Sequence, residues 1–519
     1  MLALVLAVPV LLATAPASGT AAEPETPRGA PVGGDPWVVS LGDSYISGEG
    51  GRWAGNTDES SDRVDALGPT AYFDNPTDTG ELIPGCHRSK SAEVHIGGAY
   101  QSKNLACSGA QTETFTESNG NFKPGLDFYD VDGDQGQALM LQEFATTNRV
   151  THIAVSIGGN NFGFAPTVET CVEDFALSTP LDDFYCSQDA TVTDRFSPQS
   201  AAARKAEIVT GLQNVRQAMR NAGYTDGSYS VSVQNYVTPI PYGTDFRYPE
   251  SGYSRITDGG CGFWDVDANW SLNEAMRVVN TTSFEAALAS GLENLVLVDV
   301  SGLTSDRLLC QDGVELLPDG VVSDWQFPGA VDVSEWINQV RTASTITGPY
   351  QLQESLHPNY WAQLALRNCL RQVVGDGTPT GGSCVRSGGG LDADGEPPVA
   401  LQPSPIPLRP TAVADDVSTV LGTTLNVAAP GVLDNDVAAE ASDVLVSTLV
   451  GVAAHGTVTL LADGSFEYVP GAGFSGTDTF TYRAADADAT SEVVTVTVVV
   501  AGVSSPNPAP SPVAPRFTG

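Results

Sequence analysis

The cysteines divide this chain of 519 residues into two unlike parts. All eight lie before residue 385, at Cys86, Cys107, Cys171, Cys186, Cys261, Cys310, Cys369 and Cys384. An even number of cysteines in an exported chain predicts disulfide bonds. Sequential pairing (86–107, 171–186, 261–310 and 369–384) is the simplest of the connectivities that eight cysteines allow. No Cys-x-x-Cys pair occurs, so neither a zinc site nor a redox motif is indicated.

The first 22 residues are predicted to be a secretory signal peptide, which makes the protein extracellular. Leu2 to Leu12 is almost wholly apolar, and Thr20-Ala21-Ala22 supplies the small residues of a cleavage site. No Lys or Arg precedes the apolar run, so either the true start lies upstream or the signal is atypical. The run falls well short of the ~20 residues that span a bilayer, which disfavours a membrane anchor.

The charge balance excludes one class of partner. The chain has 24 Lys and Arg against 62 Asp and Glu, a formal net charge of -38. Such a surface repels phosphate backbones, so we expect no nucleic-acid partner.

The composition and residue pattern of the chain change after the last cysteine. Residues 386–410 are rich in Gly and Pro and are predicted to be a linker. Residues 411–501 alternate apolar with polar residues, with turn signals such as Asp463-Gly464 between the runs. This pattern is typical of an all-β sandwich. Residues 502–519 are rich in Pro and Ser and are predicted to be disordered.

The first part alternates strand and helix patterns. Short apolar runs predict strands at 37–41, 150–157, 229–233 and 295–300. Apolar residues at helical spacing lie between them, at Ile208, Leu212, Val215 and Met219, and again at Leu272, Met276 and Val279. This alternation predicts an α/β domain with a mostly parallel sheet.

Three loops at or near strand ends carry candidate chemistry, because reactive groups gather at the carboxyl ends of parallel strands. Ser44 follows Gly42-Asp43 at a predicted strand-to-helix turn, where it is either a nucleophile or an ordinary N-cap. Gly109 lies in a small-residue loop that lets a backbone N–H approach a substrate. Asn160 follows the second strand, and its amide is suited to an oxyanion. For the loops of Gly109 and Asn160, the alternative interpretation is an ordinary turn.

A fourth candidate lies far downstream. His357 precedes Pro358 at a predicted helix start, a rigid position for a general base. Glu354 stands three residues earlier and is one candidate to orient it. The other histidines have no such setting and are predicted to be structural or surface residues: His87, His95, His152 and His455.

Together these residues resemble the four blocks of the SGNH, or GDSL-type, hydrolase family, in the family's order. The resemblance covers roughly residues 36–385 and is nearest to the bacterial secreted esterase and lipase branch, which shares the run Cys86-His87-Arg88-Ser89. No Gly-x-Ser-x-Gly elbow of the ordinary α/β-hydrolases occurs. The resemblance implies a three-layer α/β/α, flavodoxin-like catalytic domain that needs no cofactor.

The resemblance also implies a role for each residue. Ser44 attacks an ester carbonyl, and His357 takes its proton and returns it to the leaving alcohol. The oxyanion hole consists of the N–H groups of Ser44 and Gly109 and the Asn160 side chain. The family usually has Asp where this chain has Glu354, and some relatives use the backbone carbonyl two residues before the histidine, here that of Ser355. We favour the Ser355 carbonyl, with Glu354 second.

A second departure from the family is Asn161, where Asp is common; that position does no chemistry.

Residues 411–501 resemble a bacterial cadherin-like or Ig-like repeat. The telling runs are 429–436, 455–457, 463–468 and 474–482. Such modules act as spacers or adhesive units, and some bind calcium. Four aspartates supply hard oxygen ligands or serve as turn residues: Asp434, Asp436, Asp486 and Asp488.

The sequence therefore predicts a secreted, monomeric carboxylic ester hydrolase acting on lipids, held near a surface or partner by its second domain. An acetyl esterase acting on polysaccharides is the rival within enzymes. A non-catalytic surface or adhesion protein that has kept the fold is the rival from another class.

Overall fold

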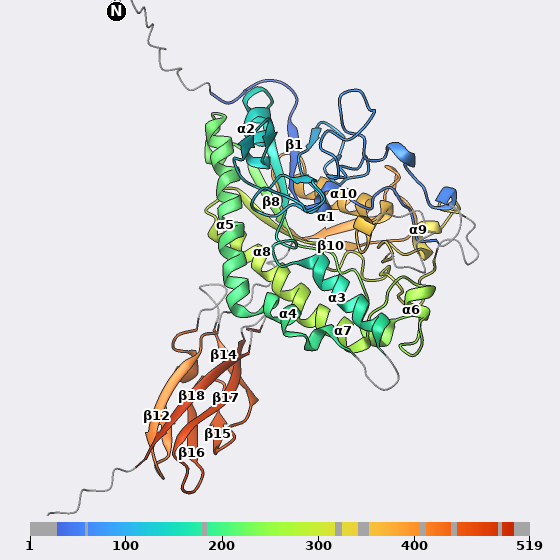
Figure 1. The fold of residues 1–519 in the computed structure, drawn as a ribbon. Coiled ribbons are helices and arrows are strands. Elements are labelled where there is room, and N and C mark those ends of the chain that lie inside the picture. The colour runs from blue at the N-terminus through green and yellow to red at the C-terminus, as the bar shows by residue number, and fades with distance from the viewer. Residues whose placement is uncertain are drawn as a thin grey trace, which may run out of the picture.

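The computed structural model describes residues 29–57, 61–178, 184–316, 324–340, 352–403, 410, 412–436, 444–485, 490–491 and 493–502. The predicted signal peptide, Asp486, Asp488 and nearly all of the predicted disordered tail lie outside these residues. Figure 1 shows a mixed α/β region followed by a region made of strands. Among the described residues, no helix combines the length and the apolar character needed to cross a bilayer.

A seven-stranded sheet forms the centre of the first region, in the order β11-β10-β9-β8-β7-β1-β2. Its strands are β1 (Trp37–Gly42), β2 (Gln101–Asn104), β7 (Val150–Ser156), β8 (Ser230–Gln234), β9 (Leu295–Asp299), β10 (Gly382–Arg386) and β11 (Val399–Gln402). Every neighbouring pair is parallel except β10 and β11. The predicted mostly parallel sheet is confirmed, and four of its strands, β1, β7, β8 and β9, are the apolar runs of the sequence.

Helices cover both faces of the sheet. One core cluster joins α2 (Gln137–Thr147) and α5 (Pro198–Asn221) to residues of β1 and β7 such as Leu41 and Val155. The other joins α10 (Tyr360–Val374) to neighbouring strand positions such as Val38. Adjacent strand residues point to opposite faces of the sheet, so a strand such as β1 contributes side chains to both core clusters.

The apolar stripe of α5 is confirmed, since Ile208, Leu212, Val215 and Met219 are all buried. The predicted helix around Leu272 and Met276 is present but interrupted. It consists of α7 (Asp265–Trp270), a π-helical segment (Ser271–Met276) and α8 (Arg277–Ala289). In Figure 1, α5 and α8 run beside each other along one side of this region.

The remaining elements of the first region are short, apart from α3. They are α1 (Ser44–Ser47), α3 (Phe164–Leu177), α4 (Ala190–Thr193), α6 (Ser254–Thr257), α9 (Ala330–Val333), β3 (Phe115–Thr116), β4 (Phe122–Lys123), β5 (Asp130–Val131) and β6 (Asp134–Gln135).

The four disulfides follow the sequential pairing that the sequence favoured. They join Cys86 to Cys107, Cys171 to Cys186, Cys261 to Cys310, and Cys369 to Cys384. All lie in the α/β region, where they close loops of 15 to 49 residues between elements.

Part of the predicted linker at 386–410 belongs to the sheet of the α/β region. Residues Val399–Gln402 form β11, which pairs antiparallel with β10 and completes the sheet edge. The intervening loop is tied to α10, because Arg371 makes two hydrogen bonds, of 2.6 and 2.8 Å, with Glu396. The Gly and Pro residues of this segment predict a loop. The edge strand β11 has four residues, which are too few to show a strand pattern in the sequence.

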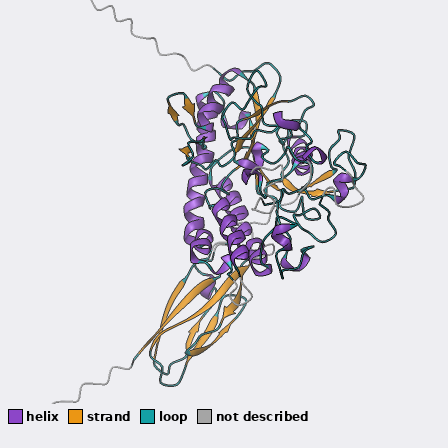
Figure 2. Cartoon of the chain, turned by 45° about the vertical axis from the view of Figure 1, so that its right-hand side comes forward, coloured by secondary structure: helices purple, strands orange, loops and turns teal. Residues whose placement is uncertain are grey.

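The second region is a β-sandwich, as predicted (Figure 2). One sheet has the order β12-β18-β17-β14 and the other β13-β16-β15. The strands are β12 (Asp415–Val420), β13 (Leu425–Val427), β14 (Val446–Gly451), β15 (Gly456–Leu460), β16 (Phe466–Pro470), β17 (Gly476–Ala485) and β18 (Val494–Ala501). Alternate residues such as Phe480, Tyr482, Val496 and Val498 form the core between the sheets.

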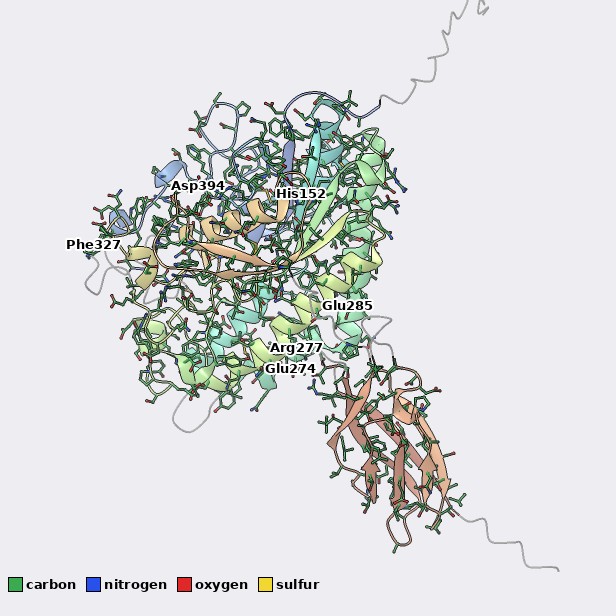
Figure 3. The ribbon with its side chains drawn as sticks, turned by 180° about the vertical axis from the view of Figure 1, so that it is seen from behind. His152, Glu274, Arg277, Glu285, Phe327 and Asp394 are labelled. Atoms are coloured by element: carbon green, nitrogen blue, oxygen red, sulfur yellow. A yellow bond between two sulfur atoms is a disulfide. The ribbon has the colours of Figure 1, made fainter. Side chains whose placement is uncertain are left out.

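The sandwich approaches the α/β region near the π-helical segment. Glu274 and Arg277 lie at the end of the α/β region nearest the sandwich (Figure 3), and Nη2 of Arg483 stands 3.8 Å from Oε1 of Glu274.

Candidate active site

Ser44 is aimed by a sharp exit from β1. The strand ends at Gly42, which has φ +129°, and a Cβ there would lie 1.8 Å from the Ser156 carbonyl oxygen on β7. Only glycine fits that approach. Asp43 then caps α1 and accepts the Tyr45 N–H over 3.3 Å. Ser44 therefore stands at the carboxyl edge of the parallel sheet, where the sequence placed it.

A glutamine holds the peptide groups of Gly42. Gly42 N–H donates to Oε1 of Gln137 over 2.7 Å, and Nε2 of Gln137 donates to the Gly42 carbonyl over 2.8 Å. Gln137 is fully buried at the start of α2. This pairing fixes the turn that leads to the serine, and no local pattern in the sequence points to it.

His357 reaches Ser44 from the far end of the chain. Its Nε2 lies 2.6 Å from Oγ of Ser44, and its Nδ1 lies 3.0 Å from the Ser355 carbonyl oxygen. A carbonyl only accepts, so Nδ1 carries the proton and Nε2 is the acceptor for the Ser44 hydroxyl. Burial lowers the pKa of His357, against the opposing charge of Glu49. A neutral imidazole thus faces the serine.

The Glu354 carboxylate is engaged on other partners. Its Oε2 accepts from the Trp53 indole over 3.0 Å, and its Oε1 accepts from the Tyr72 hydroxyl over 2.5 Å. Of the two orienting groups that the sequence left open, the Ser355 carbonyl is the one at hydrogen-bond distance from Nδ1 of His357. Glu354 contributes its backbone carbonyl, which accepts the His357 N–H over 3.2 Å.

Asn160 and Gly109 lie on the loops beside Ser44. One N–H of the Asn160 amide donates to the Ala110 carbonyl over 3.0 Å, which orients the side chain, and Asn160 lines the same pocket as Ser44. Gly109 has φ +77°, and a disulfide at Cys107 holds its loop. Asn161 points elsewhere, with its amide donating to Thr112 and Glu207.

Tyr236 joins two of these loops. Its hydroxyl donates to Oδ2 of Asp43 over 2.5 Å and accepts the Gly159 N–H over 2.8 Å. Burial raises the pKa of Asp43 to about 7, although the Tyr236 hydroxyl opposes the rise. Tyr236 comes two residues after β8, and this place near the carboxyl end of a parallel strand is the one sequence signal for it.

Of the two settings predicted for His87, structural or surface, the structure excludes the surface. His87 is buried, and its Nδ1 lies 2.7 Å from Oε1 of Glu49, whose Oε2 is 3.7 Å from Nε2 of His357. The sequence did carry a signal for Glu49, a lone charge between the glycines that follow Ser44.

The other three histidines have separate partners. His95 bonds Ser102, His152 bonds Ser230 and Ser232, and the His455 ring stacks on Phe474.

An apolar pocket opens at Ser44. Its wall comes from α3, the π-helical segment and α8, with Cys171 of a disulfide among the lining residues. The apolar side chains that line it are Phe162, Phe164, Val168, Phe196, Pro239, Ile240, Phe263, Trp270, Ala275, Met276, Val279 and Leu356. The lining around Ser44 is mostly apolar, so the pocket offers few hydrogen-bond partners.

No metal centre is evident in the described part of the chain, which holds no group of three or more His, Cys, Asp or Glu side chains fit for an ion. Asp436 accepts from the Val413 N–H and the Tyr482 hydroxyl, and Asp434 ends a short 3₁₀ turn. Since Asp486 and Asp488 lie outside the described residues, calcium binding stays a prediction.

Comparison with known proteins identifies the second region. Residues 408–502 match the bacterial cadherin-like domain family. The β-sandwich is a bacterial cadherin-like domain. No curated protein matches this chain significantly.

Solved structures add only distant likenesses. A carbohydrate acetylesterase from Sinorhizobium meliloti is 12% identical over 50% of this chain and 83% of its own, with a TM-score of 0.21. An endo-fucoidan hydrolase of glycoside hydrolase family 107 is 11% identical over 73% of this chain and 62% of its own, with a TM-score of 0.15. Scores this low carry no argument about the α/β region.

Proposed function

We propose that the α/β region is a serine carboxylic ester hydrolase of the SGNH type, with Ser44 as nucleophile and His357 as general base. The observation that carries the proposal is the 2.6 Å contact between Oγ of Ser44 and Nε2 of His357, with Nδ1 of His357 on the Ser355 carbonyl. A nucleophile, a base within reach and a group that orients the base form the arrangement of an activated serine.

In the proposed reaction, Oγ of Ser44 attacks the ester carbonyl carbon while its proton passes to Nε2 of His357. The tetrahedral intermediate then expels the alcohol, which takes the proton from Nε2 and leaves an acyl-enzyme. Water repeats the sequence: it gives a proton to Nε2, attacks the acyl carbon, and releases the acid as the proton returns to Oγ.

Three donors are suited to the oxyanion of that intermediate. They are the N–H groups of Ser44 and Gly109 and the amide of Asn160. Loss of one such donor typically costs about 3–4 kcal/mol of transition-state stabilisation.

The apolar pocket favours acyl esters of lipids as substrates. Its lining has aromatic and aliphatic side chains from Phe164 to Met276 and begins at the nucleophile. An acetyl group would leave most of this surface without a partner, which argues against the acetyl esterase. The disulfides and the cadherin-like domain are compatible with an extracellular enzyme that this domain holds near a surface.

A fluorophosphonate probe tests the proposal. The wild type is expected to be labelled at Ser44, and Ser44→Ala is expected to remain unlabelled. A folded wild type that resists the probe would support the non-catalytic rival. A panel of p-nitrophenyl esters from acetate to palmitate, a phospholipid and acetylated xylan then separates lipid from polysaccharide substrates.

A further inference from the structure

A buried carboxylate lies on the Ser44 side of the His357 ring. Glu49 is completely buried, and its Oε2 stands 3.7 Å from Nε2 of His357, the nitrogen that meets the serine hydroxyl. Glu49 comes two residues after α1, and its N–H donates to the Ser44 carbonyl over 3.1 Å. One tight turn therefore carries both the nucleophile and this carboxylate.

Glu49 is held in its charged form. Oε1 lies 2.7 Å from Nδ1 of His87, and Oε2 accepts a hydrogen bond from the Ser108 hydroxyl. Burial opposes the charge, but His357, His87 and Ser108 outweigh it and hold the pKa of Glu49 below its ordinary value. A buried carboxylate with several donors remains ionised at neutral pH.

His87 is itself fixed as the partner of Glu49. Its ring stacks on Tyr72 with centroids 4.7 Å apart, and its Nε2 lies 3.7 Å from Glu81. Burial disfavours its charge, yet Glu49, Glu81 and Glu354 together raise the pKa of His87. Its φ of +47° is rare for a residue with a side chain, and such backbone persists only where the surroundings hold it in place.

We propose that Glu49 is the positioning carboxylate of the Ser44–His357 pair, approaching the imidazole from its Nε2 side. This inference rests on the proposed esterase function. Nδ1 of His357 faces a neutral carbonyl, so that side supplies orientation without a full charge. When Ser44 attacks, Nε2 gains a proton and the ring becomes an imidazolium, and the Glu49 carboxylate 3.7 Å away stabilises the new positive charge.

Glu49 also ties the histidine to the oxyanion loop. Its bond from Ser108 fixes the residue before Gly109, and Nε2 of Gln353 donates to that same Ser108 hydroxyl over 2.8 Å. One carboxylate thus contacts the turn of the nucleophile, the base and the loop that carries a predicted oxyanion donor.

In the described part of the chain, the ionisable groups that face the His357 ring are Glu49, His87 and Tyr45. Tyr45 stays neutral, because burial raises its pKa and its hydroxyl donates to the Leu356 carbonyl over 3.0 Å. Of these groups, Glu49 raises the pKa of His357 and His87 lowers it. Removal of the Glu49 charge is therefore expected to lower the pKa of His357.

The test is Glu49→Gln, which keeps the shape and removes the charge. We expect kcat on a p-nitrophenyl ester to fall roughly 10- to 100-fold with KM within about twofold, and the acid limb of kcat/KM to move about one unit to lower pH. Glu93→Gln is the control for the same substitution at another buried carboxyl group, since Glu93 is equally buried but bonds Gln234, and it should leave both quantities unchanged. A fall in kcat with an unmoved acid limb would mean a merely structural role and overturn the proposal.

A second readout separates this inference from the esterase proposal. The pKa of His357, followed by NMR of ¹⁵N-labelled histidines without substrate, should fall in Glu49→Gln whether or not an ester is hydrolysed. An unchanged pKa overturns the role of Glu49, whereas an inactive wild type that resists the fluorophosphonate overturns the esterase. If Glu49→Gln does not fold, Glu49→Asp decides. It keeps the charge farther from Nε2, so the acid limb should move in the same direction by less, and an unmoved limb contradicts the proposal.

Discussion

The hydroxyl of Tyr236 donates to the Asp43 carboxylate over 2.5 Å, in a site where burial raises the pKa of Asp43 to about 7. The same hydroxyl accepts the Gly159 N–H, so one phenol sets the spacing between the loop of Ser44 and the loop of Asn160. Two strand ends, β1 and β7, are thereby held in register at the proposed active site.

Tyr236→Phe is expected to leave the Asp43 carboxylate and the Gly159 N–H without the hydroxyl that bonds them. We expect a loss of roughly 1–3 kcal/mol in the free energy of unfolding, because buried polar groups become unpaired. We also expect about a tenfold fall in kcat, as Ser44 and Asn160 lose their fixed spacing. Urea unfolding and ester turnover measure the two effects. Tyr242→Phe, at an exposed tyrosine, is the control, and equal behaviour of the two variants would refute the bridging role.

Glu354→Gln is expected to act on stability more than on catalysis. The carboxylate of Glu354 accepts hydrogen bonds from Trp53 and Tyr72, and both bonds weaken when the charge is lost. We expect a loss of about 1–3 kcal/mol in unfolding free energy, with kcat within about threefold because Ser355 still orients His357. A loss of turnover as deep as that of His357→Ala would instead make Glu354 the third catalytic group.

Filling the apolar pocket is expected to shorten the preferred acyl chain. Ala275 is buried in the pocket wall beside Met276, so Ala275→Phe places a ring in the path of a long chain. The ratio of kcat/KM for laurate over acetate esters should fall by about tenfold or more, because each methylene contact that is lost weakens binding of the long acyl chain. Leu288→Phe, on the exposed face of α8, should leave the ratio unchanged. An unaltered ratio in Ala275→Phe would place the acyl chain elsewhere.

Stability should fall as pH rises because of Glu93. Burial raises the pKa of Glu93 from 4.5 to about 8. Between these values the folded protein holds a proton that the unfolded chain has released. The contribution of Glu93 to the unfolding free energy is therefore complete below pH 4.5 and is lost as pH rises to about 8, by at most about 5 kcal/mol.

Glu93→Gln is neutral at every pH and should remove this dependence. Relative to the wild type, the variant should gain unfolding free energy steadily from pH 5 to pH 8.5, as measured by urea denaturation at each pH. Parallel curves for the two proteins would show that Glu93 is ionised in the folded state.

The sequence predicted those parts of the site that have a local signature. Ser44 and Asn160 follow strand ends, and His357 precedes a helix whose start Pro358 marks. The structure brings Ser44 and His357 into contact across 313 positions of the chain. The parallel sheet was predictable for a similar reason, since strands buried on both faces are continuous apolar runs.

The missed residues act through contacts that no local pattern encodes. Gln137 meets Gly42 from 95 positions away, and Tyr236 meets Asp43 from 193. Glu49 is near Ser44 in sequence, but its partners His87 and His357 come from loops that only the folded chain assembles. β11 was missed because its four residues follow two prolines and pair with a single neighbour.

The position of β11 sets where the two regions can be separated by recombination. A junction placed at residue 386 would remove β11 and expose the backbone groups of β10 along a sheet edge, which is the kind of edge that recruits other chains. A junction after Gln402 leaves that edge covered. The cadherin-like region can thus be exchanged for another domain, provided that β11 stays with the α/β region.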